Sequence, residues 1–157
     1  MGRILAVCIG PGGIPKRTVS VTRVTESGLE GDAQRLLEFH GGIDRAVCLL
    51  SQKEVKDLGI DGVPLGEPGQ FGENLRVEGL DFSSLRPGDQ LAIGRAPRSS
   101  VSAGRILLEI TDMRSPCVTL SSIDKRLPDL MLGRSGLLCK VLEPGEVAPG
   151  MAIELVE

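Results

Sequence analysis

The sequence predicts a mainly β protein, an antiparallel barrel or sandwich that carries one or two short helices. Short apolar or alternating segments recur along the 157 residues, separated by 21 glycines and 10 prolines that reverse the chain often. The chain has three phenylalanines and no tryptophan or tyrosine, so its core must consist mainly of Val, Ile, Leu and Ala. This length fits one domain, and we expect a single domain over residues 1–157.

The apolar segments give the expected strands. They are Ile4–Ile9, Thr18–Val24, Ala46–Leu50, Asn74–Val77, Gln90–Ile93, Arg105–Thr111, Leu137–Leu142 and Met151–Val156. Pro87-Gly88 and Pro149-Gly150 each predict a turn that leads into an alternating strand. The polar stretch Arg95–Gly104 is expected to be a loop.

One helix is indicated by a capping box at Ser51–Glu54, in which the serine hydroxyl accepts an amide N–H and Glu54 reaches back to the cap. Gly59 is placed to end this helix. A second helix is expected to begin near Ser121 or Ser122, and Pro128 is expected to interrupt it.

Composition and charge argue against several classes of partner. Single-stranded nucleic acid is usually held by aromatic rings along a basic groove, but here aromatic residues make up 2% and the net charge is −3. No apolar run approaches the roughly 20 residues that span a bilayer, and the first strand is too short for a signal-peptide core. We therefore expect a cytoplasmic protein that binds neither nucleic-acid polymers nor membranes and whose four cysteines are thiols. The single histidine and the lack of a C-x-x-C pair argue against a zinc site.

The strongest candidate for chemistry is Cys117, in Arg114-Ser115-Pro116-Cys117 just past an expected strand. Pro116 restricts the backbone and so directs the thiol, and the cation Arg114 would lower the pKa of that thiol toward the reactive thiolate. The alternative is a buried, inert cysteine, the commoner state of a thiol. That alternative suits the cysteines inside apolar strands: Cys8, Cys48 and Cys139. The polar, turn-forming flanks of Cys117 favour the reactive interpretation.

Two glycine loops could bring main-chain amides to a ligand. In the first, Gly41 and Gly42 lie between His40, a titratable imidazole, and Arg45, a fixed cation. Taken singly, this segment favours the alternative of a plain glycine turn with a solvent-facing histidine and arginine. Neither loop matches the Walker or dinucleotide-binding glycine motifs.

The second loop contains Gly72 and ends in Asn74, whose amide both donates and accepts and could read a heterocycle edge or brace a loop. Further along, Gly133–Gly136 contains Arg134 and is either a hairpin connection or an anion-binding nest. For this last segment the hairpin connection is favoured.

Taken in order, these motifs resemble the molybdenum cofactor sulfurase C-terminal (MOSC) domain family. The matching elements are Glu30-Gly31-Asp32, Phe39-His40-Gly41-Gly42, Arg45-Ala46-Val47, Ser51 with Glu54, Pro68-Gly69, Phe71-Gly72-Glu73-Asn74-Leu75, Pro87-Gly88-Asp89, Ile110-Thr111, Arg114, Pro116-Cys117, Gly133-Arg134-Ser135-Gly136, Val141 and Pro144-Gly145-Glu146-Val147. Each motif is weak alone, but the ordered set is strong and covers roughly residues 28 to 155. Two departures are an insertion at Arg95–Gly104 and Gly150-Met151 in place of the family's final Gly-Asp.

The resemblance implies a closed or nearly closed β-barrel, similar to the barrel domain of pyruvate kinase, with a pocket near Cys117. In the family this cysteine is proposed to carry sulfur as a persulfide. In related enzymes that reduce N-hydroxylated compounds, a cysteine thiolate ligates molybdenum. The implied cofactor is therefore the molybdenum cofactor (molybdopterin). The cofactor sulfurases add a pyridoxal-phosphate domain, for which this chain has no room, so no pyridoxal-phosphate reaction is expected.

The resemblance also suggests roles for the candidate residues. Cys117 and His40 are the expected catalytic residues, with Cys117 as the molybdenum ligand if the cofactor is loaded. The expected cofactor-binding residues are Gly41, Gly42, Arg45, Gly72, Asn74, Arg114 and Arg134. The three arginines would hold phosphate and other anionic oxygens, because guanidinium forks match phosphate geometry. His40 and Asn74 would orient substrate or exchange protons.

Two classes of function are consistent with these residues. One is an enzyme, either for sulfur transfer or as a component of a molybdenum-dependent reductase. The alternative is a non-catalytic module that binds or delivers the cofactor to a biosynthesis enzyme, and a vestigial pocket on a stable scaffold is a further alternative. The expected partners are a small-molecule cofactor or sulfur donor and a cofactor-biosynthesis or redox protein.

Overall fold

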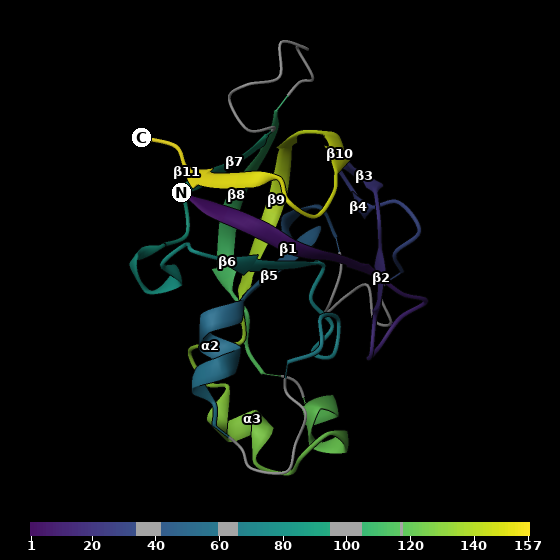
Figure 1. Cartoon of the computed structure of the whole chain (residues 1–157), viewed down its shortest axis with the longest axis vertical. Coiled ribbons are helices and arrows are strands. Elements are labelled where there is room, and N and C mark those ends of the chain that lie inside the picture. Colours follow the sequence, from purple (N-terminus) through teal and green to yellow (C-terminus); the bar gives the residue numbers. More distant parts are fainter. Residues whose placement is uncertain (34–41, 60–65, 95–104, 117) are drawn as a thin grey trace.

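The computed structural model describes residues 1–33, 42–59, 66–94, 105–116 and 118–157, which form a β-barrel with short helices on one side (Figure 1). The strands are β1 (Gly2–Ile9), β2 (Arg17–Val19), β3 (Thr22–Thr25), β4 (Gly28–Leu29), β5 (Val47–Ser51), β6 (Leu75–Glu78), β7 (Gln90–Gly94), β8 (Ile106–Met113), β9 (Leu137–Glu143), β10 (Gly145–Val147) and β11 (Ala152–Leu155). The helices are α2 (Gln52–Asp57) and α3 (Leu127–Leu130), with 3-10 turns η1 (Ile43–Arg45), η2 (Phe82–Ser84) and η3 (Val118–Ser122).

The barrel closes through β1, as expected from the sequence. Strands β1, β11, β7, β8, β9, β5 and β6 pair in that order, and β6 pairs back onto β1. Gly2 pairs with Ile153 on one edge of β1, while Val7 pairs with Leu75 on the other. One pair, β5 with β6, is parallel, because the chain crosses over through α2 instead of turning in a hairpin. Strands β10, β3 and β4 form a separate small sheet.

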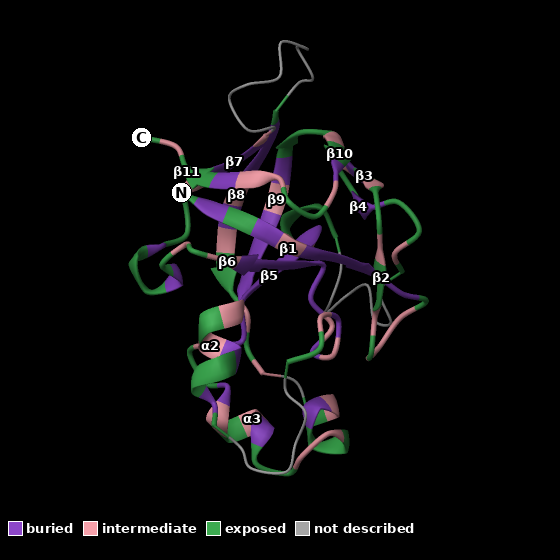
Figure 2. Cartoon of the chain, in the orientation of Figure 1, coloured by how far each residue is buried: buried purple, intermediate pink, exposed green. Residues whose placement is uncertain are grey.

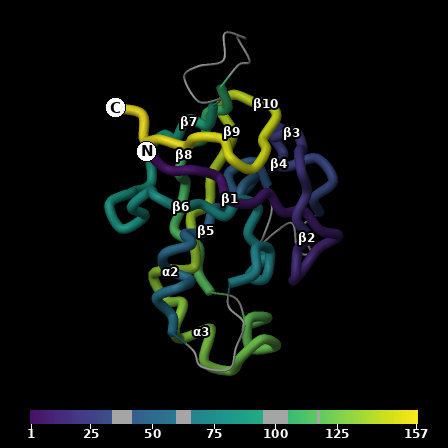
Figure 3. Tube along the Cα trace, viewed as in Figure 1, coloured from purple at the N-terminus to yellow at the C-terminus, as the bar shows by residue number. Residues whose placement is uncertain are grey.

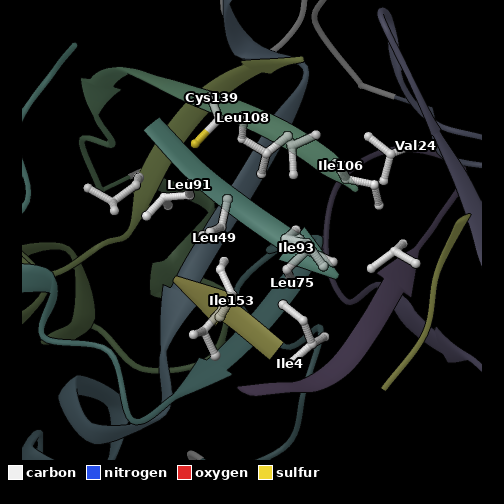
Figure 4. Packing of buried hydrophobic residues seen from close by; sticks show 14 of the residues in the cluster. Ile4, Val24, Leu49, Leu75, Leu91, Ile93, Ile106, Leu108, Cys139 and Ile153 are labelled. Carbon is white, nitrogen blue, oxygen red and sulfur yellow. The ribbon is translucent and has the colours of Figure 1, made fainter. Parts of the chain in front are cut away.

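Aliphatic side chains fill the barrel interior (Figure 4). Alternate residues of each strand point inward, so Leu49, Leu75, Ile93 and Ile153 meet in the core. The expectation of an aliphatic core is confirmed, since Phe82 is the one aromatic residue of this cluster among the described residues. Figure 2 shows the buried residues concentrated on these strands.

Several expected boundaries were wrong. The single strand expected over Thr18–Val24 is two strands, β2 and β3, which belong to different sheets. Strands β4 and β10 were missed, because they have two and three residues, too few for a periodic pattern, and owe their pairing to β3.

The first helix is confirmed as α2. The Ser51 hydroxyl accepts a 3.4 Å hydrogen bond from the Glu54 amide, and the helix ends just before Gly59, whose φ is +58°. The expectation near Ser121 was wrong: η3 precedes a separate helix, α3, that has Pro128 in its first turn. A proline there removes no intrahelical hydrogen bond, so it starts the helix instead of interrupting it.

A second apolar cluster packs the helices against the outside of the barrel. It consists of Leu50, Val55, Leu58, Phe71, Leu120, Leu127 and Met131. Figures 1 and 3 show α2 and α3 on the same side of the barrel. Within the described ranges, no helix has the length and apolar character needed to cross a membrane.

Candidate functional site

Six of the candidate residues are described by the structure: Gly42, Arg45, Gly72, Asn74, Arg114 and Arg134. Cys117, His40, Gly41 and the whole insertion at Arg95–Gly104 lie outside the described residues. The described part of the candidate site consists of the segments on either side of Cys117 and the strands that these segments contact.

Polar groups line up across the outer face of the wall formed by β1, β6 and β5. The inward-pointing residues of this wall are Val7, Leu75 and Leu49, all in the barrel core. Their neighbours Cys8, Asn74 and Cys48 alternate to the outer face, where they are nevertheless buried. This face is the base of the candidate site.

The Asn74 side chain links the strands of this wall by hydrogen bonds. Its Oδ1 accepts a hydrogen bond from the Cys48 amide at 3.0 Å. Its Nδ2 donates to the Cys8 carbonyl oxygen at 3.3 Å and to the Asp32 carboxylate at 2.9 Å. Both amide hydrogens thus have protein partners, and the side chain braces β1, β5 and the turn at Asp32.

Two buried ion pairs lie against this wall. Lys16 Nζ contacts Asp32 Oδ1 at 2.7 Å, with 7% and 4% of the two side chains exposed. Arg76 Nε donates to Glu73 Oε2 at 2.7 Å, and both side chains are fully buried. Burying a charge is costly unless it is paired and hydrogen-bonded, and here each charge has its counter-ion.

The Glu73–Arg76 pair anchors the second glycine loop. Arg76 Nη1 donates to Gln52 Oε1 at 2.8 Å in α2, and Nη2 donates to the Glu67 carbonyl oxygen at 3.1 Å. The guanidinium also lies 6.0 Å from the centre of the Phe71 ring. The loop that ends in Asn74 is therefore held between α2 and β6.

Arg114 reaches this wall from the end of β8. Its backbone N–H donates to the Gly136 carbonyl oxygen at 2.9 Å. The guanidinium lies beside Gly72, where an added Cβ would be 3.3 Å from Nη2, and it donates a hydrogen bond to the thiol of Cys48. Gly72 has a φ of +80°, so glycine here permits both the turn and the close approach of the arginine.

We refer to Cys8, Lys16, Asp32, Cys48, Glu73, Asn74, Arg76 and Arg114 as the polar layer. Lys16 and Arg76 each have a carboxylate partner within it. No carboxylate of the described residues forms an ion pair with Arg114. Counting the described residues alone, the layer therefore carries one positive charge without a carboxylate partner, at the residue three positions before Cys117.

The other candidate residues lie in two further places. Gly42 precedes η1 with a φ of +95°, and η1 is fastened to β8 by a 2.5 Å hydrogen bond from Thr111 Oγ1 to the Asp44 carbonyl oxygen. Arg45, the last residue of η1, is half-buried. Arg134 Nε donates to the Leu130 carbonyl oxygen at 2.7 Å at the end of α3. The structure thus brings Gly72, Asn74 and Arg114 together, while Arg134 caps α3.

The described thiols are all buried and not in disulfides. Burial, reinforced by the negative charge of Glu73, raises the pKa of Cys8 to about 12. Burial also raises the pKa of Cys48, although Arg114 opposes this shift, and it raises the pKa of Cys139 inside the barrel. These three cysteines are poor nucleophiles at neutral pH.

Sequence reasoning missed part of the polar layer. Asp32 belonged to a recognised motif but received no role, and Lys16 was not considered. Lys16 could have been found from its position in the sequence, because it ends the glycine-rich loop that directly follows β1. From there a buried side chain can reach the outer face of the wall formed by β1, β6 and β5. Among the described residues, no three His, Cys, Asp or Glu side chains gather into a set that could hold a metal ion.

The chain resembles known proteins in sequence and in fold. The family model "MOSC domain" matches residues 37–154. The chain is 32% identical over 143 residues to protein YiiM of Escherichia coli, covering 85% of this chain and 58% of that protein. It is 31% identical over 150 residues to YflK of Bacillus subtilis, covering 92% of this chain and 63% of that protein.

The chain thus spans about six tenths of the length of the curated relatives that it matches. The solved structure of the YUAD protein from Bacillus subtilis superposes with a TM-score of 0.77 at 22% identity, covering 99% of this chain and 96% of that one, which supports the fold. The family match over residues 37–154 includes the segments of Gly72, Asn74, Arg114 and Cys117. The chain therefore belongs to the MOSC domain family of molybdenum-cofactor-related domains.

Proposed function

We propose that this chain binds the molybdenum cofactor, with Arg114 holding its anionic group and Cys117 as the sulfur carrier or molybdenum ligand. The observation that carries this proposal is the charge of Arg114, which has no carboxylate partner among the described residues, in a layer where Lys16 and Arg76 are paired. A guanidinium next to a low-dielectric protein surface binds a phosphate or another small anion most strongly, because its fork of N–H groups donates to two oxygens of the anion at once.

The residues fit such a ligand. Arg114 is half-buried, so part of it is accessible from the exterior, and the absence of a side chain at Gly72 lets its guanidinium lie close to the glycine loop. Thiolate sulfur is a suitable ligand for a soft or high-valent metal centre, and an arginine three positions before Cys117 in the sequence would favour its thiolate. When bound, the cofactor would supply the redox-active molybdenum, while the chain supplies the anion contact and the thiol.

The properties of Cys48 help to identify the reactive thiol. It lies close enough to receive a hydrogen bond from Arg114, yet its pKa is raised by burial. A thiol that remains protonated is neither a strong nucleophile nor a metal ligand. The reactive role is therefore assigned to Cys117, whose polar flanks distinguish it from the three buried cysteines.

The test is metal and pterin analysis of protein produced in a molybdenum-replete host. We expect molybdenum and pterin in the wild type, and a loss of both in Arg114→Met, because losing a charge-assisted hydrogen bond costs about 1.5–3 kcal/mol, or roughly 10- to 150-fold in affinity. Arg105→Met is the matched control, since Arg105 is exposed and 4.0 Å from its partner Glu143. Equal loading of wild type and Arg114→Met would overturn the assigned role of Arg114.

The same preparations separate the classes of function. The protein is exposed to a small-molecule persulfide, whose outer sulfur transfers to the Cys117 thiolate while the S–S bond of the donor breaks and the donor leaves as a thiolate. Sulfur bound to Cys117 as a persulfide, found by intact-protein mass spectrometry, supports the carrier. Turnover of an N-hydroxylated base by cofactor-loaded protein with a reductant supports the reductase component. Loaded protein that does neither supports the binding or delivery module.

A further inference from the structure

The Lys16–Asp32 ion pair lies at the junction of three segments. The Asp32 carboxylate accepts four hydrogen bonds: two from Lys16 Nζ at 2.7 and 2.8 Å, one from the Gly10 amide at 3.0 Å and one from Asn74 at 2.9 Å. It therefore joins the end of β1, the loop that follows β1, and the start of β6 in one buried contact.

From Lys16 the contact continues to the second glycine loop. The Lys16 amide donates to the Gly69 carbonyl oxygen at 2.8 Å. A Cβ at Gly69 would lie 2.2 Å from the Lys16 carbonyl oxygen, so the two backbones approach as closely as glycine allows. Fixing the Lys16 side chain on Asp32 therefore fixes the position of this glycine loop.

The same loops meet at Arg114. A Cβ on Gly72 would be 3.1 Å from Ile14 Cγ2 and 3.3 Å from Arg114 Nη2. Gly72 is thus enclosed between the loop held by Lys16 and the guanidinium of Arg114. Even one added methyl group at Gly72 would press on both neighbours, so a shift of the Gly10–Lys16 loop toward Gly72 would be transmitted to Arg114, because closely packed atoms have little room to move.

We infer that the Lys16–Asp32 pair is a positioning device for Arg114: it sets the orientation of the anion-binding guanidinium without contacting the anion. This inference rests on the proposed function, which assigns the anion to Arg114. An ion pair whose side chains are almost entirely buried is suited to this task, since its short, directed hydrogen bonds hold one arrangement of the loops where an apolar contact would tolerate several.

The test uses inorganic phosphate as the probe, titrated calorimetrically into the full chain. In the neutral-pair variant, Lys16→Met with Asp32→Asn, both buried charges are removed together, so no unpaired ion remains to unfold the protein. We expect phosphate affinity to fall at least about threefold, within the range measured for coupled residues. In the Arg114→Met background the same double change should cause no further loss, because Arg114 mediates the effect.

A matched control removes the exposed pair Lys53–Asp57, with side chains 83% and 51% exposed, by the same substitutions. It leaves the net charge unchanged, as the neutral-pair variant does, and should not alter phosphate affinity. Unaltered phosphate affinity in the neutral-pair variant would overturn the inference. An equal loss of phosphate affinity in the wild-type and Arg114→Met backgrounds would also overturn it, because Lys16 would then contact the anion itself.

A second readout separates this inference from the proposed function. The Nε–H resonance of Arg114 in the phosphate-free protein should shift in the neutral-pair variant and stay in place in the Lys53–Asp57 control. An unmoved resonance overturns the positioning role whatever the protein binds. If phosphate affinity is the same in wild type and Arg114→Met while the resonance shifts, the assigned anion site fails and the link between the ion pair and Arg114 stands.

Discussion

At the scale of single residues, the environment of each thiol decides its chemistry. Burial raises the pKa of Cys8 to about 12, so at pH 8 its thiolate fraction is on the order of one in ten thousand. Cys48 and Cys139 are shifted in the same direction. We therefore expect a small alkylating agent to modify Cys117 first in the folded protein. Peptide mass mapping after partial alkylation checks this, and first labelling of any buried cysteine would contradict it.

Serine substitution separates reactivity from folding. Cys117→Ser removes thiolate nucleophilicity and soft-metal ligation, and should abolish cofactor or sulfur loading at a stability cost under about 1 kcal/mol. Cys139→Ser is the control, because Cys139 lies inside the apolar barrel (Figure 4) and a hydroxyl there costs roughly 1–3 kcal/mol. Cys117→Ser should therefore lose loading while its melting curve stays near that of the wild type, whereas Cys139→Ser should melt earlier and still load. An early-melting Cys117→Ser would place that thiol in the core.

Gly72 offers a second residue-scale test, with Gly88 as its control. Both have positive φ, +80° and +98°, so alanine strains both backbones. At Gly88 an added Cβ meets nothing within 4 Å, whereas at Gly72 it meets Ile14 and Arg114. We expect Gly72→Ala to melt earlier than Gly88→Ala and to reduce anion binding. Equal effects of the two changes would mean that the contact with Arg114 has no energetic consequence.

At the scale of elements, α2 carries a measurable electrostatic cost. Burial raises the pKa of Glu54 above its ordinary 4.5, and the positive charge of Arg134 only partly opposes this. A raised carboxyl pKa means that folding disfavours the ionised form, so the cost is present above the raised pKa and absent below 4.5. Glu54→Gln should therefore raise the melting temperature at pH 7.

The advantage of Glu54→Gln should diminish as the pH falls toward 4.5, because wild-type Glu54 then becomes neutral as well. Thermal melts of both proteins from pH 4 to pH 8 check this. A constant difference across that range would show that Glu54 has another role, such as the reciprocal half of the capping box with Ser51.

The helices and strands also show which elements local sequence patterns can predict. The capping box predicted α2 because all its partners lie within one turn. Pro128 was misread because a proline both ends and begins helices, and the preceding residues decide which. Strand β10 was missed because three residues give no period, and it exists through its pairing with β3 more than a hundred residues earlier.

At the scale of the whole molecule, the expected cofactor class leads to a prediction about metals. Preparations should contain no stoichiometric zinc, and any specific metal should be molybdenum brought in with a pterin. Elemental analysis after mild chelation checks this, since a structural zinc site holds its metal through such treatment. Zinc at about one per chain would contradict the prediction.

The sequence by itself determined the aliphatic core, most of the barrel strands, the α2 cap and the family. These depend on residue type, short-range periodicity and ordered motifs, all of which can be read along the chain. It also predicted Gly72, Asn74 and Arg114 among the cofactor-binding residues, and the structure brings these three together. For Asn74 the sequence left open a heterocycle contact or a brace for a loop, and the structure shows a brace between strands.

Only the tertiary structure decided which charges cancel. Lys16 pairs with Asp32 and Glu73 with Arg76, while Arg114 is left without a carboxylate among the described residues. It also showed that Cys48, in an apolar strand, lies on the outer face beside Arg114, whereas Cys139 lies inside the barrel. The pairing of β8, β9, β5, β6 and β1 side by side creates these relations, together with the loops that follow β1. It brings residues 16, 32, 74 and 114 onto one face through hydrogen bonds and packing that no local pattern encodes.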